Sequence, residues 1–189
     1  MDKGFFYFDD IETKMNECIL PINNDQEKKS LFDIVITNTL TEIRTGFRSH
    51  LAVAGSSIDV DKIYCNFSDV IKYSPRALQI GFLSPFPSNW FKKGVEVGTI
   101  GSILVGLEMI IWYFVLLGFI YITYKNPSVI KPLSVVFLIS ILVILLLSYV
   151  IPNVGALYRM RQGFMIPFYL IGAHGLSVMI SNFTKIQHK

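Results

Sequence analysis

Glu108 and His174 are the residues of this sequence best suited to proton chemistry. Each stands in a long apolar segment, where an isolated carboxylate costs about 2.5 kcal/mol or more and is therefore protonated, hydrated or paired. If both segments start from the same side of a membrane, a rise of about 1.5 Å per residue gives the two side chains similar depths. We predict that they pair, either as a catalytic, proton-handling or substrate-facing site or as a polar contact that only fixes helix packing.

Four arginines are candidates for binding phosphate or lipid headgroups, because the guanidinium fork matches phosphate oxygens. Arg159 and Arg161 stand two residues apart in YRMR. Such residues point about 200° apart on a helix, so this pair can grip one anion only where the chain is irregular or extended. The alternative is that both reach lipid headgroups from the interface. Arg44 and Arg48 lie on an expected amphipathic helix and are candidates for contacting membrane phosphates.

Two further pairs of residues are of the types that bind metals or do redox chemistry. Asp59 and Asp61 lie beside a hydroxyl cluster, but a hard cation needs more oxygen ligands than these residues offer. We prefer to interpret GSSIDVD as a cap for a following helix, and we predict neither a metal site nor a cofactor. Cys18 and Cys65 are the only cysteines and form no CxxC motif. The preferred interpretation is two unrelated thiols, and their pairing stays open.

Three apolar segments must position these groups. Residues 132–151 are twenty residues without a charge, enough to cross a hydrocarbon core of about 30 Å. Residues 95–124 and 163–181 complete the set, and the last segment, which contains Pro167, is expected to be short or kinked, with a re-entrant segment as the alternative. Gly98, Ser102 and Gly106 recur every four residues and predict a groove for close helix packing. The fold class is an all-α integral membrane protein with about three transmembrane helices.

The chain before these spans is polar. We expect a flexible segment at 1–30, a helical non-transmembrane or interfacial region at 31–94, and a polar tail at 182–189. Apolar residues recur at helical spacing from 31 to 51 and predict an amphipathic helix that lies on the membrane or packs on protein. Prolines at 75, 85 and 87 argue against a long helix over 72–94. Residues 90–93 (WFKK) predict an aromatic and basic collar at the bilayer surface.

Composition and charge limit the partners. The chain is 52% hydrophobic, and residues 1–94 carry eleven Lys and Arg against twelve Asp and Glu. That balance lacks the basic stripe of a nucleic-acid binder. We expect a multi-pass cell-membrane protein in a lipid bilayer. Lys and Arg number four on each side, but Lys125, Lys131, Lys185 and Lys189 lie in the short loop and tail and favour the cytoplasm. A complete chain with no signal peptide would by default take the opposite orientation.

Three blocks carry a resemblance to a known group: RTGFRSHLAVAGSSIDVDKI, SDVIKYSPRALQIGFLSPFPSNWF and PNVGALYRMRQGFMIPF. They resemble the C-terminal part of large polytopic bacterial membrane proteins of surface-polysaccharide assembly, which include O-antigen polymerase-like and lipid-linked-sugar glycosyltransferase-like proteins. The resemblance implies additional preceding helices, extracytoplasmic polar loops and a polyprenyl-linked sugar as substrate. This chain departs from the group in having three predicted spans, so whether it is an enzyme stays open. The alternative is a non-catalytic subunit that packs against other membrane helices and docks a partner protein.

Overall fold

A computed structural model describes residues 30–51, 56–91 and 98–187. Among the described residues, α2 (Leu31–Leu51) and α3 (Phe67–Leu83) precede the apolar part. Three apolar helices follow: α4 (Gly98–Lys125), α5 (Ser134–Val150) and α6 (Val154–Gln187). Short 3₁₀ turns occupy Pro87–Asn89, Pro127–Val129 and Lys131–Leu133. Within these described ranges the one β-type contact is an isolated bridge between Ser57 and Asn153.

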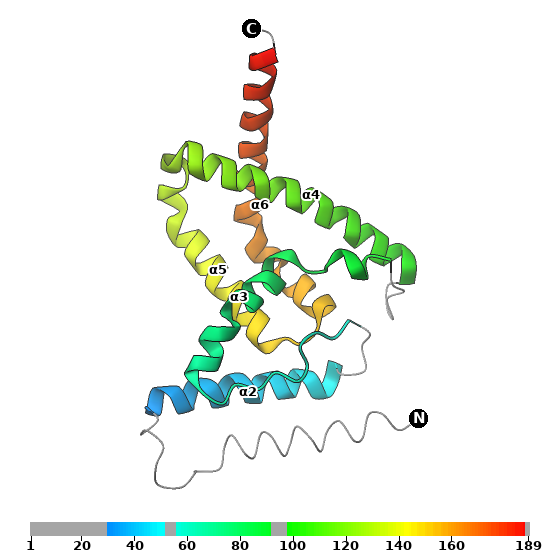
Figure 1. Ribbon diagram of the computed structural model, residues 1–189, viewed down its shortest axis with the longest axis vertical. Coiled ribbons are helices and arrows are strands. Elements are labelled where there is room, and N and C mark those ends of the chain that lie inside the picture. The colour runs from blue at the N-terminus through cyan, green and yellow to red at the C-terminus, as the bar shows by residue number, and fades with distance from the viewer. Residues whose placement is uncertain (1–29, 52–55, 92–97, 188–189) are drawn as a thin grey trace.

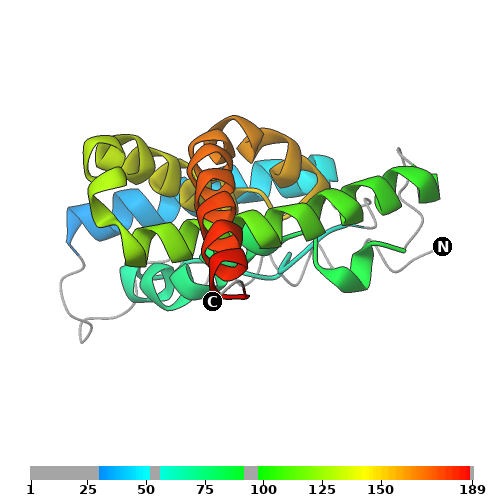
Figure 2. The ribbon, with the colours of Figure 1, turned by 90° about the horizontal axis from the view of Figure 1, so that it is seen from above.

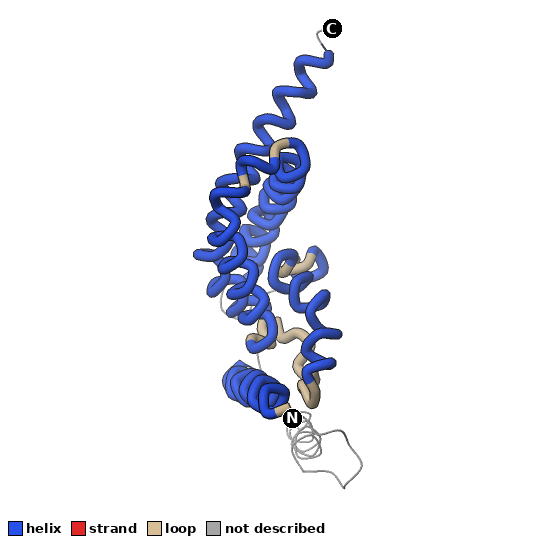
Figure 3. Tube along the Cα trace, turned by 90° about the vertical axis from the view of Figure 1, so that its left-hand side faces the viewer, coloured by secondary structure: helices blue, strands red, loops and turns tan. Residues whose placement is uncertain are grey.

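Three stretches have the length and apolar composition of membrane spans: Gly98–Lys125, Pro127–Val150 and Val154–Lys185. The predicted all-α membrane fold is confirmed. α4 and α6 cross in direct contact, and α5, which runs back toward the start of α6, lies to one side of α6 (Figure 1). We call the end of the bundle that holds Gly98, Val150 and Val154 the proximal end, and the opposite end the distal end. α2 lies across the proximal end (Figures 1 and 3).

α4 crosses α6 where three glycines meet, and Figure 2 shows this crossing from above. A Cβ atom placed on Gly118 would lie 2.2 Å from the carbonyl oxygen of Gly172. One placed on Gly175 would lie 2.1 Å from the carbonyl oxygen of Gly118. No side chain fits at such distances, so the two helix backbones touch directly, as small residues permit in membrane bundles.

The groove predicted at Gly98, Ser102 and Gly106 is not where helices meet. A Cβ on Gly98 would have nothing within 4 Å, and the Ser102 hydroxyl donates to the carbonyl of Gly98 at 3.2 Å. Gly106 instead receives the Trp90 ring, whose Cγ lies 2.9 Å from an added Cβ. Trp90 is held there by a hydrogen bond from its indole nitrogen to the Pro85 carbonyl at 2.8 Å. The small-residue spacing therefore accommodates a ring rather than a helix.

The third span starts earlier than predicted and is not short. Only three residues separate α5 from α6, and the Asn153 side chain accepts a hydrogen bond from the Ala156 N–H at 2.9 Å. Asparagine is a favoured N-cap because its oxygen satisfies a first-turn donor. The YRMR segment, which would have to be irregular or extended for its two arginines to grip one anion, thus belongs to the first turns of α6, and Pro167 lies inside a continuous helix.

α3 is one helix of 17 residues that runs through Pro75. We expected the prolines to prevent this. Pro75 lacks the N–H that would donate to the Ile71 carbonyl and its ring crowds that carbonyl, yet the helix continues through it. The helix begins at Asn66, whose N–H donates to the Asp69 carboxylate at 3.2 Å in a capping box. The cap is therefore at Asn66, and not in the GSSIDVD segment where we predicted it.

α2 buries a different face from the one that its apolar residues suggested. Its most buried residues are mainly polar: Thr37, Leu40, Thr41, Arg44 and Arg48. The apolar stripe is shared between protein and surface, since Ile36 and Phe47 pack against the core while Phe32 is 62% exposed. The buried polar side chains find partners inside the protein, which hydropathy periodicity alone does not reveal.

Candidate functional site

Glu108 is held by two neutral side chains of α6. The Tyr158 hydroxyl donates a hydrogen bond to one carboxylate oxygen, and Gln162 Nε2 donates to the other at 3.1 Å. Tyr158 and Gln162 are four residues apart, so they share the face of α6 that meets α4. The Tyr169 side chain also interacts with the carboxylate. All four residues are partly buried, and they form what we call the Glu108 cluster.

His174 does not belong to the Glu108 cluster. It is exposed on α6, next to Gly175, which packs on Gly118 of α4. Gly118 lies ten residues beyond Glu108, about 15 Å along the helix. The structure therefore separates the two residues that we predicted to pair. The depth count failed because α6 begins at Val154 rather than near 163, so His174 is farther along its helix than assumed.

Arg161 is buried, at 1% exposure, against the end of α3. Its guanidinium donates to the carbonyl oxygens of Gly81 and Ser84 and to that of Ile80 at 3.3 Å. These carbonyls belong to the last turn of α3 and the residue after it; that of Ile80 also accepts from the Ser84 N–H at 3.3 Å, whereas those of Gly81 and Ser84 lie among the last carbonyls of a helix, which have no donor within it. They also carry the partial negative charge of a helix C-terminus, which a cation neutralises. The fork of Arg161 is thus occupied by backbone oxygens rather than by phosphate.

Side chains of α4 also donate hydrogen bonds to carbonyl oxygens at the end of α3. The indole nitrogen of Trp112 donates to the Phe82 carbonyl at 2.7 Å, and the Tyr113 hydroxyl donates to the Leu83 carbonyl at 3.0 Å. Together with Arg161, they supply a donor to every carbonyl from residue 80 to residue 84. This row of carbonyls, which we call the α3 terminus, is therefore satisfied by the two spans α4 and α6.

Arg159 lies on the opposite side of α6 and is exposed. Its Nε donates to the carbonyl of Gly155, one turn earlier, at 3.4 Å. Because YRMR is helical, Arg159 and Arg161 point away from each other and do not hold one anion together. The exposed position of Arg159 fits the alternative that we left open, in which the side chain reaches the interface.

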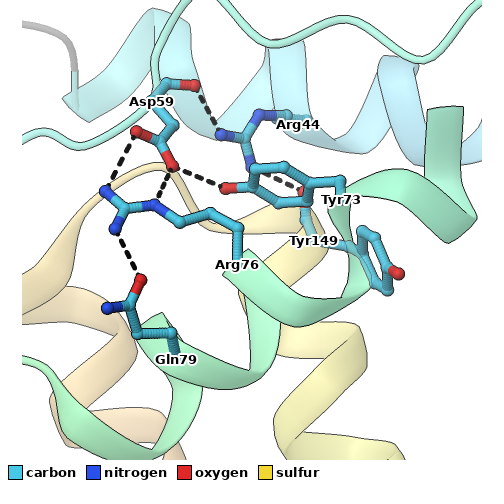
Figure 4. Close-up of polar contacts among 6 residues, drawn as sticks. All are labelled: Arg44, Asp59, Tyr73, Arg76, Gln79 and Tyr149. Carbon is cyan, nitrogen blue, oxygen red and sulfur yellow. Dashed lines mark hydrogen bonds and ion pairs between the residues drawn. The ribbon is translucent and has the colours of Figure 1, made fainter.

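Arg44 is a second buried arginine, at 3% exposure, and it lies at the end of α5 (Figure 4). Its guanidinium donates to the Tyr149 carbonyl at 2.6 Å and to the Asp59 carbonyl at 2.7 Å. The charge also lies 5.9 Å from the centre of the Tyr64 ring and 5.8 Å from that of Tyr73, distances at which a cation is attracted to the aromatic face. Arg48, one turn further, is 5% exposed. The structure thus places both arginines inside the protein rather than toward membrane phosphates.

Asp59 belongs to the same group through its side chain. Its carboxylate accepts hydrogen bonds from Arg76 Nε at 3.0 Å and from the Tyr73 hydroxyl at 3.1 Å. Figure 4 shows Arg76 extending from α3 toward Asp59, while another nitrogen of the same guanidinium donates to the Gln79 side chain. The hydrogen bond to Asp59 raises the pKa of Arg76, and burial raises the pKa of Tyr73 to about 12. Both groups therefore keep their protons at neutral pH, and the carboxylate is occupied by protein donors.

Cys65 is disulfide-bonded, and Cys18 is the only other cysteine of the sequence. Cys18 lies outside the described residues, as does the basic half of the collar predicted at 90–93. The interpretation of two unrelated thiols is wrong for Cys65. Sequence spacing gave no signal for the bond, because the two cysteines form no CxxC motif.

The residues that sequence reasoning missed are the aromatic donors. Tyr158 and Gln162 hold Glu108, and Trp112 and Tyr113 bind the α3 terminus. A usable signal was present: a tyrosine or tryptophan inside a span needs a partner for its polar atom. Comparisons with known proteins add no further constraint, since no protein-family model, no curated protein and no solved structure matches the chain.

Proposed function

We propose that the chain is the membrane-embedded part of a system that acts on lipid-linked sugars, and that the Glu108 cluster binds sugar hydroxyls. One observation carries this proposal: a partly buried carboxylate in an apolar span is held by a phenol and an amide. A carboxylate has about four acceptor positions. Tyr158 and Gln162 occupy two of them, which leaves others for a hydroxyl-rich ligand.

In this proposal Glu108 is the general base. The acceptor hydroxyl gives its proton to the carboxylate while its oxygen bonds to the anomeric carbon of the lipid-linked sugar. The bond from that carbon to the diphosphate oxygen breaks, and its electron pair leaves with the polyprenyl diphosphate. Tyr158 and Gln162 orient the carboxylate. Arg44 and Arg161 have structural roles, because their donors are directed at backbone carbonyls.

The proposal also places the proximal end on the oxidising side of the membrane. Disulfides persist in oxidising compartments, and Cys65 lies in the segment before the spans. Lys125, Lys131 and Lys185 are exposed toward the distal end, which suits the cytoplasmic side. Labelling intact cells with an impermeant maleimide tests this on the matched variants Ser68→Cys and Ser128→Cys, both at exposed serines. Position 68 should react and position 128 should not; the reverse pattern would overturn the orientation.

Binding is tested on the purified full chain in lipid nanodiscs. The probes are polyprenyl diphosphates carrying different single sugars, with the same lipid lacking a sugar as reference. We expect at least one sugar-bearing lipid to raise Tm more than the reference does. Glu108→Gln should abolish this difference because the amide cannot serve as an equivalent acceptor or base. His174→Gln, at the exposed position outside the cluster, should retain it.

A difference that survives in Glu108→Gln would place the sugar elsewhere. Equal shifts by every sugar-bearing lipid and the reference would contradict sugar recognition and favour a second candidate function, a non-catalytic subunit. One observation favours that candidate: the first turn of α2 exposes Leu31 at 81%, Phe32 at 62% and Val35 at 62%. Pull-down of one defined membrane protein by the native chain, lost in Phe32→Ser, would support it.

A further inference from the structure

The second half of α3 and the chain after it form an unusual stretch of sequence. Residues 77–91, ALQIGFLSPFPSNWF, contain no charged residue over fifteen positions. A stretch of this length is too short to cross a bilayer as a helix and is typical of buried or re-entrant segments. The last charge before it is Arg76, which pairs with Asp59.

The α3 terminus lies well inside the bundle of spans. Gly81 packs on α5, where an added Cβ would lie 2.8 Å from Ile144 and 2.7 Å from the Ser148 hydroxyl. Arg161, which holds the α3 terminus, is seven residues after the start of α6, about 10 Å along that helix. The Phe82 ring meets the Phe168 ring of α6 at 5.3 Å. The end of α3 therefore lies beside all three spans and not beyond them.

The segment starts at the proximal end, and the chain turns back toward that end after the α3 terminus. α3 begins beside α2, where the Phe67 ring lies 6.0 Å from the Phe32 ring. After the α3 terminus the chain turns back through Trp90, which packs on Gly106, and α4 then starts at Gly98 on the same side. Figure 1 shows α3 rising from α2 toward the middle of the bundle before the chain turns toward the start of α4.

We propose that residues 67–91 form a re-entrant membrane segment, and that lipid acyl chains contact its outward apolar face. Hydrocarbon offers no hydrogen bonds, so irregular backbone at membrane depth must be satisfied by protein. The donors from Arg161, Trp112 and Tyr113 to residues 80–84 meet this requirement. A helix end open to water would need none of them, because water satisfies its last carbonyls.

Acyl chains are the occupant that the surroundings favour. The outward face includes Ile71, at 57% exposure, and Leu78, at 38%. α3 packs directly on α5, whose own outward residues Leu142 and Leu146 are more than half exposed and uncharged. The apolar surface of the spans thus continues onto α3. The charged residues of α3, Asp69, Lys72 and Arg76, all precede residue 77, nearer the proximal end.

Spin labels on the full chain in nanodiscs test the proposal. Leu78→Cys places a nitroxide on the inserted half of α3, and Ser68→Cys places one in its exposed first turn. We expect oxygen, which concentrates in acyl chains, to relax the label at 78 more strongly than a water-soluble nickel chelate does. The label at 68 should show the opposite order. Gln79→Cys, also exposed, serves as the inserted position if Leu78→Cys does not fold.

Relaxation by the nickel chelate at both positions would overturn the insertion, because it would place the α3 terminus in water. Low accessibility to both reagents at 78 would overturn lipid as the occupant and assign this face to a companion helix or a second copy of the chain. These readouts involve no sugar ligand, so they stand or fall separately from the binding test of the Glu108 cluster.

Discussion

The guanidinium of Arg44 donates to the carbonyl oxygen of Tyr149 at 2.6 Å across 105 residues of sequence. Tyr149 is the next-to-last residue of α5, so a cation of α2 neutralises the C-terminal end of a span. Arg161 does the converse, since a cation of α6 binds the C-terminal end of α3. Two buried arginines thus join the helices that precede the spans to the spans themselves.

Arg161→Lys is expected to destabilise the fold. Lysine keeps the charge but offers a single nitrogen, which cannot reach the Gly81 and Ser84 carbonyls as a planar fork does. Hydrogen bonds to charged groups contribute about 1.5–3 kcal/mol each, so we expect a loss of about 3 kcal/mol or more. Unfolding in mixed micelles titrated with dodecyl sulfate measures it. Arg159→Lys, at the exposed neighbouring arginine, should change stability by less than about 0.5 kcal/mol; equal losses would remove the special role of Arg161.

Arg44→Lys should weaken the attachment of α2 while leaving the spans folded. The variant loses either the bond to Tyr149 or the bond to the Asp59 carbonyl, along with the planar contact with two tyrosine rings. We expect earlier proteolysis within α2 than in the native chain, measured by limited digestion in nanodiscs. Glu42→Gln, on the exposed side of α2, is the matched control. Unchanged digestion in Arg44→Lys would contradict this attachment.

Most of the fold could be predicted from the sequence, because apolar run length is a strong signal. The span over residues 132–151 agrees with α5 to within two residues at each end. The irregular parts could not be predicted in this way. Asn153 begins a helix ahead of the span that we predicted from residue 163, and Asn66 begins α3 after the GSSIDVD segment where we predicted its cap. A single polar cap residue is a weak signal beside hydropathy.

The site was predicted less well, for a physical reason. Glu108 was correctly placed within a span. Its partners, however, depend on which residues of α6 lie level with it. A nine-residue error in the start of α6 shifts the predicted position of every α6 residue by about 14 Å along the helix. The arginines were assigned by their affinity for phosphate, whereas unsatisfied carbonyls at helix ends compete for the same fork. Which carbonyls lie within reach of an arginine is determined by the tertiary fold and cannot be read from the sequence.

Stability should fall at high pH partly through Tyr73. Burial raises the pKa of this hydroxyl to about 12 from an ordinary value of about 10. The unfolded chain therefore releases the proton first, so the contribution to stability is complete below pH 10 and is lost as pH rises toward 12. Thermal scans between pH 8 and 12 should show Tm falling more steeply for the native chain than for Tyr73→Phe. Tyr124→Phe, at a side chain that is 91% exposed, should follow the native curve; a Tyr73→Phe curve parallel to the native one would contradict this assignment.

Gly118→Ala should separate α4 from α6. The added methyl would lie 2.2 Å from the Gly172 carbonyl oxygen and 2.6 Å from the Leu176 nitrogen, and backbone atoms cannot rotate away as a side chain can. Forced separation of a tight contact costs about 1–3 kcal/mol. Gly163→Ala is the control on α6, because an added Cβ there meets nothing within 4 Å and alanine favours a helix by up to about 1 kcal/mol. Unfolding in mixed micelles should therefore show a loss for the first variant and no loss for the second. If Gly118→Ala were as stable as the native chain, the direct backbone contact at this crossing would not hold.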